Sequence, residues 1–190
     1  MKIRLACPLQ QDSIVDGEGI RTVIWTQGCA HKCQGCHNPQ THDFNKGYEV
    51  DIEDVKKTIL QLNIQDGVTL SGGDPFFQAE ASKEIARFCK EQGLSVWAYT
   101  GFTYERLSEM MEYRKDIRGL MENVDVLIDG KFDPDERSLN LQFRGSKNQR
   151  VIDVKESMEC GCVVEIEKYN QENNYMGYDE LAKEKEYLYI

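Results

Sequence analysis

The stretch RTVIWTQGCAHKCQGCHN, residues 21–38, holds three cysteines directly after a run of β-branched and aromatic residues. The run, residues 21–27, predicts a buried β-strand. The cysteines follow it at Cys29, Cys33 and Cys36, with the spacing C-x3-C-x2-C. Four local thiolates would close a structural zinc site, whereas three leave one coordination position open. The stretch therefore predicts a metal-binding loop at the end of a strand.

The spacing alone leaves three kinds of metal site open. A [4Fe-4S] cluster held by the three cysteines would keep one iron free for a ligand from outside the protein. A zinc site of the Cys3His type would use His31 or His37 as its fourth ligand. An electron-carrier cluster would need a distant fourth cysteine, and the chain offers Cys7, Cys89, Cys160 and Cys162.

Outside the loop, short apolar runs alternate with amphipathic segments, which is the pattern of parallel strands joined by helices. Asp51 is a candidate N-cap for a helix that ends near residue 62. We expect further helices over residues 79–91 and from about residue 104. The other expected strands cover residues 3–6, 68–70, 95–99, 124–128 and 149–154.

The number of expected strand and helix units limits which α/β architectures the chain can form. A closed eight-unit barrel needs about 250 residues, and the chain has 190. We therefore expect an α/β fold, an incomplete or partial (β/α) barrel with about five or six parallel strands and outer helices. Ligands of such folds bind at the carboxyl ends of the strands. We expect residues 1–154 to form this domain and residues 155–190 to form an extension packed on it, with no role assigned.

Charge and composition limit the partners. The chain has 33 acidic and 23 basic residues, a net charge of -10, which repels nucleic acid and anionic membranes. No stretch approaches the roughly 20 apolar residues of a membrane span, and the first residues lack the apolar core of a signal peptide. Seven cysteines, an odd number, fit a reducing compartment. We expect a cytoplasmic protein with protein or small-molecule partners.

Five motifs, taken in order, resemble a known family. They are VDGEGIRTVIWTQGCAHKCQGCHNPQTHDF (15–44), LSGGDPF (70–76), YTGFTYE (99–105), LIDGKF (127–132) and FRGSKNQR (143–150). The cysteine loop resembles the radical S-adenosylmethionine (SAM) superfamily. The whole set resembles the activating proteins of the anaerobic (class III) ribonucleoside-triphosphate reductase. Gly35 stands where the wider superfamily often has an aromatic residue, and it fits the narrower family.

The resemblance implies an oxidoreductase with a radical-SAM partial barrel. Cys29, Cys33 and Cys36 would bind three irons of a [4Fe-4S] cluster, and SAM would bind the fourth. Reductive cleavage of SAM would give a 5′-deoxyadenosyl radical, which takes a hydrogen from a backbone glycine of the reductase and leaves a glycyl radical. The implied cofactors are the cluster and SAM. The implied partners are the large subunit of that reductase and a flavodoxin- or ferredoxin-type electron donor.

The resemblance also implies a SAM site and no catalytic residue beyond it and the cluster. Asp74, where the superfamily often has Glu, would contact the SAM amino group together with two glycines. Lys131 would face the SAM carboxylate. The implied cofactor-binding residues are Gly72, Gly73, Asp74, Thr100, Asp129 and Lys131. Arg144, Ser146, Asn148 and Arg150 are polar candidates for completing the SAM site or docking the partner. Glu18 and Arg21 are candidates for a lip that faces the partner.

Two alternative functions are kept. One is an activase of another glycyl-radical enzyme, such as pyruvate formate-lyase. The other is a non-catalytic metal-binding or electron-transfer protein, for which the Gly-Gly-Asp motif would be dispensable.

Several residues have a structural interpretation. Trp25 and Trp97 are expected in the core, and Cys7 and Cys89 as structural thiols. His31 and His37 are expected to pack the cysteine loop without binding metal. The Cys160-x-Cys162 pair could bind metal or form a redox pair, but the favoured interpretation gives it no function. The Gly-Tyr within residues 174–178 is read as a coincidence.

Overall fold

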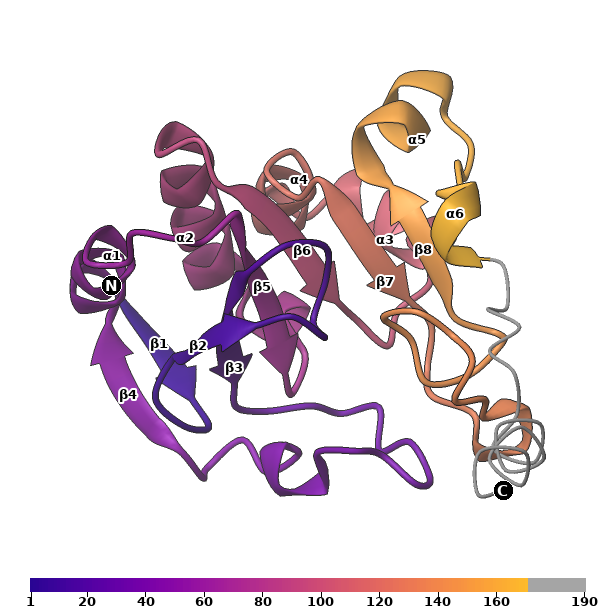
Figure 1. Cartoon of the computed structure of the whole chain (residues 1–190), viewed down its shortest axis with the longest axis horizontal. Helices are drawn as coiled ribbons and strands as arrows, with labels where there is room; N and C mark the ends of the chain where they lie inside the picture. Colours follow the sequence, from indigo (N-terminus) through magenta and orange to yellow (C-terminus); the bar gives the residue numbers. More distant parts are fainter. Residues whose placement is uncertain (171–190) are drawn as a thin grey trace, which may run out of the picture.

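A single mixed sheet organises the chain in the computed structural model, which describes residues 1–170 (Figure 1). Its strand order is β4-β1-β3-β5-β6-β7-β8, and β2 pairs with β3 on the side. The strands are β1 (Lys2–Leu5), β2 (Gln10–Ser13), β3 (Arg21–Thr26), β4 (Tyr48–Asp51), β5 (Gly67–Gly72), β6 (Ser95–Tyr99), β7 (Val126–Asp129) and β8 (Arg150–Asp153).

Four neighbouring strands, β3, β5, β6 and β7, run parallel. This confirms the α/β class with parallel strands and outer helices, but it is fewer than the five or six parallel strands expected. The last predicted strand, β8, is antiparallel to β7. Residues 130–149 join these two strands without an α-helix, and a connection without a crossover returns the chain in the opposite direction. At the other edge, β1 is antiparallel to both β3 and β4.

The helices follow the amphipathic segments of the sequence. They are α1 (Ile52–Leu60), α2 (Ala79–Glu91), α3 (Tyr104–Met111), α4 (Lys115–Met121), α5 (Val154–Cys160) and α6 (Glu167–Asn170). The predicted N-cap is confirmed, because the Asp51 side chain accepts a hydrogen bond from the backbone N–H of Glu53. The prediction missed β2, β4, α4, α5 and α6. β2 reads QQDS and has no apolar alternation, and α4 is seven residues long with a glycine inside.

The core lies mainly between the sheet and helices α1 to α4. One row of buried residues crosses five strands in register: Ile24, Leu70, Ala98, Leu127 and Ile152. Successive side chains along a strand point to opposite faces, so the neighbouring positions form a second row away from the helices. Trp97 and Tyr99 of β6 belong to that second face, together with Trp25 of β3. The candidate site lies at its carboxyl end.

Residues 155–170 run back along the outer strand β8. Ile166 N–H donates to the carbonyl of Val151, and Tyr169 packs against Trp97 and Phe143. Residues 174–178 lie outside the described part of the chain. Within residues 1–170, no helix is both long enough and apolar enough to cross a membrane.

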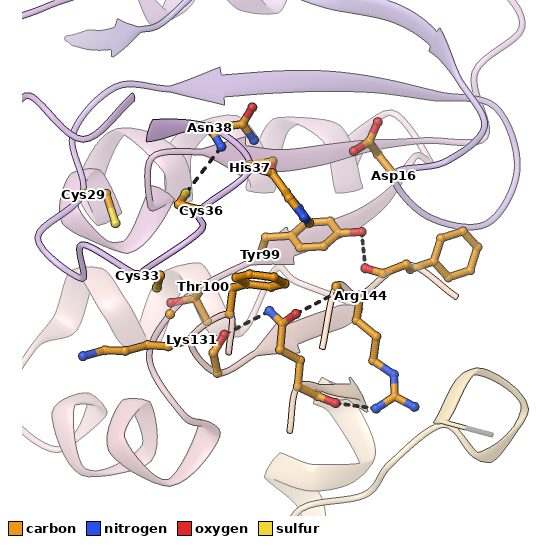
Figure 2. Close-up of a pocket in the computed structure, with 18 of the residues that line it drawn as sticks. Asp16, Cys29, Cys33, Cys36, His37, Asn38, Tyr99, Thr100, Lys131 and Arg144 are labelled. Atoms are coloured by element: carbon orange, nitrogen blue, oxygen red, sulfur yellow. Dashed lines mark hydrogen bonds between the residues drawn. The ribbon is translucent and has the colours of Figure 1, made fainter. Parts of the chain in front are cut away.

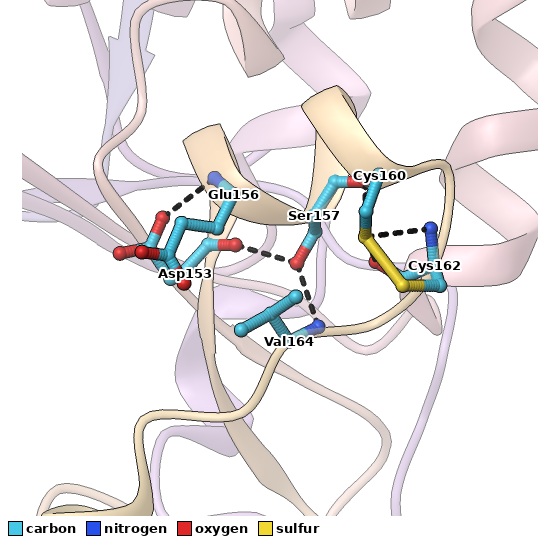
Figure 3. The surroundings of a disulfide bond; sticks show 6 residues. All are labelled: Asp153, Glu156, Ser157, Cys160, Cys162 and Val164. Carbon is cyan, nitrogen blue, oxygen red and sulfur yellow. Dashed lines mark hydrogen bonds between the residues drawn. A yellow bond between two sulfur atoms is a disulfide. The ribbon is translucent and has the colours of Figure 1, made fainter.

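Cys160 and Cys162 are joined by a disulfide, the bonded form of the redox pair that the sequence left open (Figure 3). Gly161 ends α5 in the left-handed conformation, with φ of 69°, and turns the chain back at once. The two Cα atoms are thereby 5.4 Å apart, inside the range that a disulfide spans.

Candidate active site

A cavity of about 660 Å³ opens where the parallel strands end (Figure 2). Four successive strand-end segments contribute to its wall: the cysteine loop after β3, Ser71 to Gly73 at the end of β5, Tyr99 to Gly101 at the end of β6, and Gly130 to Phe132 after β7. All three loop cysteines line it. The sheet therefore brings together the motifs that lie far apart in the sequence, at the edge where α/β folds bind ligands.

The first part of the cysteine loop is fixed by backbone hydrogen bonds. Gly28 N–H donates to the carbonyl of Thr41 over 2.8 Å, and Cys29 N–H donates to the carbonyl of His42 over 3.1 Å. Cys29 is buried, and burial raises the pKa of its thiol to about 11. Cys33 and Cys36 are partly exposed at the cavity. The loop thus holds one inner and two outer thiols.

The donor set fits an iron–sulfur cluster better than a zinc ion. Within residues 1–170, no group of three or more His, Cys, Asp or Glu side chains is placed to hold one metal ion. Each thiolate of a cluster binds its own iron, so cluster ligands lie farther apart than the ligands of a single ion. The three sulfurs lie spread along one side of the cavity. Three thiolates on one wall of the cavity suit a cluster, which binds one iron per thiolate, whereas tetrahedral zinc requires its ligands to converge on one point.

The two loop histidines are used otherwise, as expected. His31 Nε2 lies 2.8 Å from Asp74 Oδ2, and its ring packs edge-on against Phe102 with centroids 4.5 Å apart. His37 lies at the cavity against Phe132, with ring centroids 4.9 Å apart.

Gly72 and Gly73 both line the cavity, and both are required by the close approach of two chain segments. A Cβ on Gly72 would lie 2.5 Å from the carbonyl oxygen of Thr26, and one on Gly73 would lie 2.4 Å from that of Gly28. Gly73 N–H also donates to Thr26 O over 2.7 Å. The glycine pair therefore lies directly against the backbone that leads into the cysteine loop.

Asp74 has contacts that the sequence did not predict. It is 1% exposed, and its carboxylate accepts hydrogen bonds from His31, Thr100 and the backbone N–H groups of Gly101 and Phe76. It is not among the residues that line the cavity. The carboxylate faces three neighbouring loops, and its expected contact with the SAM amino group stays a prediction.

The structure places Thr100 and Lys131 at the cavity and Asp129 away from it. Thr100 lines the cavity and donates its hydroxyl hydrogen to Asp74 over 2.8 Å. Lys131 is exposed at the cavity, and no residue in the described range 1–170 forms an ion pair with it. Asp129 is buried away from the cavity, where it accepts hydrogen bonds from Arg150 and from the N–H of Tyr104 at the start of α3. Lys131 is thus the member of the Asp-x-Lys pair that a ligand in the cavity can reach.

The residues of the FRGSKNQR segment have two roles. Some line the cavity, and others hold its wall in place. Arg144 lines the cavity and donates to the carbonyls of Gln149 and Asn170. The buried hydroxyl of Ser146 accepts from the N–H of Asp133, and the amide of Asn148 donates to the carbonyl of Lys131. Arg150 is held by Asp129 and Glu105. Asn148 and Ser146 therefore hold the segment from Lys131 to Asp133 in place.

Three expectations are corrected by burial. Arg21, expected on a partner-facing lip, is fully buried and hydrogen-bonded to residues of β5 and β6, whereas Glu18 is exposed and pairs with Lys168. Trp97 is in the core as expected, but Trp25 is half-buried and lines the cavity. Cys89 is buried, whereas Cys7, expected to be structural, is exposed.

Tyr99 is a cavity residue that the sequence analysis missed. Its hydroxyl donates to the carbonyl of Phe143 over 2.7 Å, and burial raises its pKa. The sequence contained a signal for this position. Tyr99 lies two residues from Trp97 in one strand, so both side chains share a face of the sheet. It also directly precedes Thr100, a residue expected at the site. The exposed apolar pair Ile14 and Val15, also at the cavity, gave no such signal because it lies outside any strand.

Comparison with known proteins agrees with this site. The family described as a 4Fe-4S single cluster domain matches residues 15–152, which include the four strand-end segments of the cavity wall. An α/β fold with a cysteine loop at its strand ends thus defines an iron–sulfur protein. The anaerobic ribonucleoside-triphosphate reductase-activating protein of Haemophilus influenzae is 32% identical over 149 residues, covering 72% of this chain and 89% of that protein. The chain belongs to the family of anaerobic ribonucleoside-triphosphate reductase-activating proteins.

Two further similarities are more partial. The pyruvate formate-lyase-activating enzyme of Clostridium pasteurianum is 36% identical over 111 residues, which cover 55% of this chain and 47% of that enzyme. Among solved structures, QueE from Escherichia coli aligns with a TM-score of 0.45 and 17% identity over 54% of each chain.

Proposed function

We propose that this protein is an activating enzyme that uses a [4Fe-4S] cluster and SAM to remove a hydrogen atom from a backbone glycine of the anaerobic ribonucleoside-triphosphate reductase. The observation that carries the proposal is the shared cavity: three cysteines and the Gly72–Gly73 pair line the same space at the carboxyl ends of parallel strands. The cavity of about 660 Å³ beside the thiols leaves room for a second ligand such as SAM.

The chain divides the binding task among its strand-end loops. Cys29, Cys33 and Cys36 would hold three irons of the cluster, which, once reduced by an external electron donor, would supply the one-electron reductive cleavage of SAM. Gly72 and Gly73 present backbone without side chains, which lets an amino-acid head group approach closely. The exposed ammonium of Lys131 suits the carboxylate of the same ligand.

The cavity is open enough to admit a protein segment as well. Ile14 and Val15 line it while remaining 72% and 69% exposed, so they offer apolar contacts to a partner. A loop from the reductase large subunit would place its glycine over the cavity there. A flavodoxin- or ferredoxin-type protein would supply the electron. A cytoplasmic location belongs to the same proposal, because ribonucleoside triphosphates are cytoplasmic metabolites.

The reductase is favoured over pyruvate formate-lyase as target by the extent of similarity. The reductase-activating relative from Haemophilus influenzae aligns over 89% of its length, whereas the pyruvate formate-lyase-activating enzyme aligns over 47%.

The proposal is tested under anaerobic conditions. The protein is reconstituted with iron and sulfide, reduced, and mixed with SAM, and 5′-deoxyadenosine and the electron paramagnetic resonance (EPR) spectrum are measured. We expect a reduced [4Fe-4S] signal that changes when SAM binds, followed by a glycyl-radical signal when the reductase is added. Cys33→Ala is expected to lose the cluster and SAM cleavage. A protein that holds one tight zinc ion and is silent toward SAM would overturn the proposal.

A further inference from the structure

The Asp74 carboxylate is the meeting point of three strand-end loops. Its Oδ2 atom accepts from His31 Nε2 and Thr100 Oγ1, each over 2.8 Å, and from Gly101 N–H over 3.0 Å. Its Oδ1 atom accepts from Phe76 N–H over 2.9 Å. Oδ2 thus accepts from three donors and Oδ1 from one, and the side chain is 1% exposed and does not line the cavity. A ligand in the cavity would therefore have to displace one of these groups to reach this side chain.

His31 lies inside the cysteine loop, two residues from Cys29 and two from Cys33. A carboxylate only accepts hydrogen bonds, so the contact with Asp74 requires a proton on Nε2. In the described range 1–170, no other hydrogen bond joins residues 30–35 to a strand end. This hydrogen bond therefore ties the stretch between the first two thiols to the sheet, together with the ring packing of His31.

The surroundings of His31 are shaped for this contact. Phe77 and Phe102 pack against its ring, with centroids 5.4 and 4.5 Å away. A Cβ on Gly101 would lie 2.5 Å from the imidazole Cδ2 atom, so only glycine leaves room for the ring. The His31 side chain is 9% exposed and that of Asp74 is 1% exposed, and hydrogen bonds to a charged group in such a dry site are strong.

We propose that Asp74 is a positioning residue for the cluster, fastening the cysteine loop through His31 and joining it to the Thr100–Gly101 loop, and that it does not bind SAM directly. The proposal rests on the proposed function in one respect, because it takes Cys29, Cys33 and Cys36 as cluster ligands. Groups hydrogen-bonded directly to a metal ligand commonly change metal affinity tenfold to a hundredfold. Asp74 contacts no cysteine and acts through His31, on the segment between two ligands, so we take this range as the upper limit for its effect.

Asp74→Asn provides the first test. An asparagine cannot satisfy the four donors, because its NH2 group must face either Phe76 N–H or the three donors at Oδ2. The readout is the rate at which a chelator removes iron from the anaerobically reconstituted protein. We expect a faster release from Asp74→Asn, with roughly tenfold to a hundredfold as its upper limit. Asp74→Glu keeps the charge and both acceptor oxygens, so it should restore part of the resistance.

His31→Phe separates a specific contact from general destabilisation. It removes the donor to Asp74 but keeps an aromatic ring against Phe77 and Phe102. We expect faster iron release, an altered EPR spectrum of the reduced cluster, and a double variant with Asp74→Asn that is no worse than the more affected single variant. Asp51→Asn is the matched control, since it exchanges an N-cap of α1 for an equally good one.

Two results would overturn this proposal, and a third would refute the proposed function alone. If Asp74 binds SAM, Asp74→Asn will keep its iron as tightly as the wild type and lose SAM affinity, while His31→Phe will bind SAM normally; that result overturns the proposal. The iron-release assay contains no SAM, so a wild type that holds a cluster but never cleaves SAM would refute the proposed function alone. If no cluster can be installed, amide hydrogen exchange over residues 30–35 decides, and equal exchange in wild type and both variants overturns the proposal.

Discussion

The guanidinium of Arg21 lies over the ring of Trp97, 5.2 Å from its centroid, at the opposite end of β3 from the cysteine loop. Arg21 is fully buried, and desolvation lowers its pKa to about 10, so it remains charged at neutral pH. Its hydrogen bonds go to neutral oxygens, among them the carbonyls of Val68 and Ser95. A buried cation thereby joins three strands, β3, β5 and β6, at their amino ends.

Arg21→Met should lower the free energy of unfolding by about 3 kcal/mol, because the buried carbonyls of Val68 and Ser95 lose their donor. Urea denaturation monitored by circular dichroism measures the change. Arg21→Lys should lose less, because it keeps the charge and some of the hydrogen bonds. A methionine variant as stable as the wild type would show that these carbonyls find other partners.

Arg21 also shows what sequence reasoning could not reach. The cysteine spacing and the Gly-Gly-Asp motif were interpretable because each is local, whereas an arginine at the start of a strand reads as a surface residue. Its burial is compensated by Thr69 and Ser95, which lie 48 and 74 positions away in the chain. Asp74 and His31 are a similar case, separated by 43 positions. Compensation of buried polar groups depends on the tertiary structure, which no local pattern encodes.

Strand direction was the other feature of the fold that the sequence did not predict. The runs that became β1 and β8 have the apolar composition of strands, but direction is set by the connection between elements. Residues 130–149 form cavity wall and contain no α-helix, so β8 returns antiparallel. The same segment supplies Lys131 to the cavity.

Gly73→Ala should reduce cluster loading and SAM affinity together. The added methyl group would lie 2.4 Å from the carbonyl oxygen of Gly28, which belongs to rigid backbone at the start of the cysteine loop. Gly93→Ala is the matched control: its φ of 78° costs about 1 kcal/mol of backbone strain, but nothing lies within 4 Å of its Cβ. Iron content and calorimetric SAM titration measure both variants. Equal losses in the two would show that the Gly73 contact has no special role.

Lys131→Gln should weaken SAM binding by about twofold to fivefold and leave the iron content unchanged. The ammonium is exposed, so an ion pair with a carboxylate contributes roughly 1 kcal/mol at most. Isothermal titration of the reconstituted protein at two salt concentrations measures it, and the wild-type advantage should shrink at high salt. Lys155→Gln, an exposed lysine on α5, is the control. An unchanged dissociation constant for Lys131→Gln would remove this residue from the SAM site.

Glu105 should contribute to stability only above acidic pH. The side-chain hydrogen bonds from Arg150 hold its pKa at about 2, below the ordinary value of 4.5. A carboxyl with a depressed folded-state pKa stabilises above its unfolded pKa, and the contribution disappears as the pH falls from about 4.5 to about 2. Since the side chain is 58% exposed, we expect roughly 0.5 kcal/mol. Thermal unfolding of Glu105→Gln and wild type should differ at pH 6 and converge near pH 2; a constant difference would contradict this.

The Cys160–Cys162 disulfide predicts a thiol count. Five cysteines are free, so the metal-free protein, unfolded without reductant, should react with five equivalents of a thiol reagent and with seven after reduction. The Cys160→Ser, Cys162→Ser double variant should give five in both cases. Because the disulfide closes a ring of only three residues, its removal should cost no more than about 2 kcal/mol. Seven reactive thiols in the unreduced wild type would show that the two cysteines are not joined.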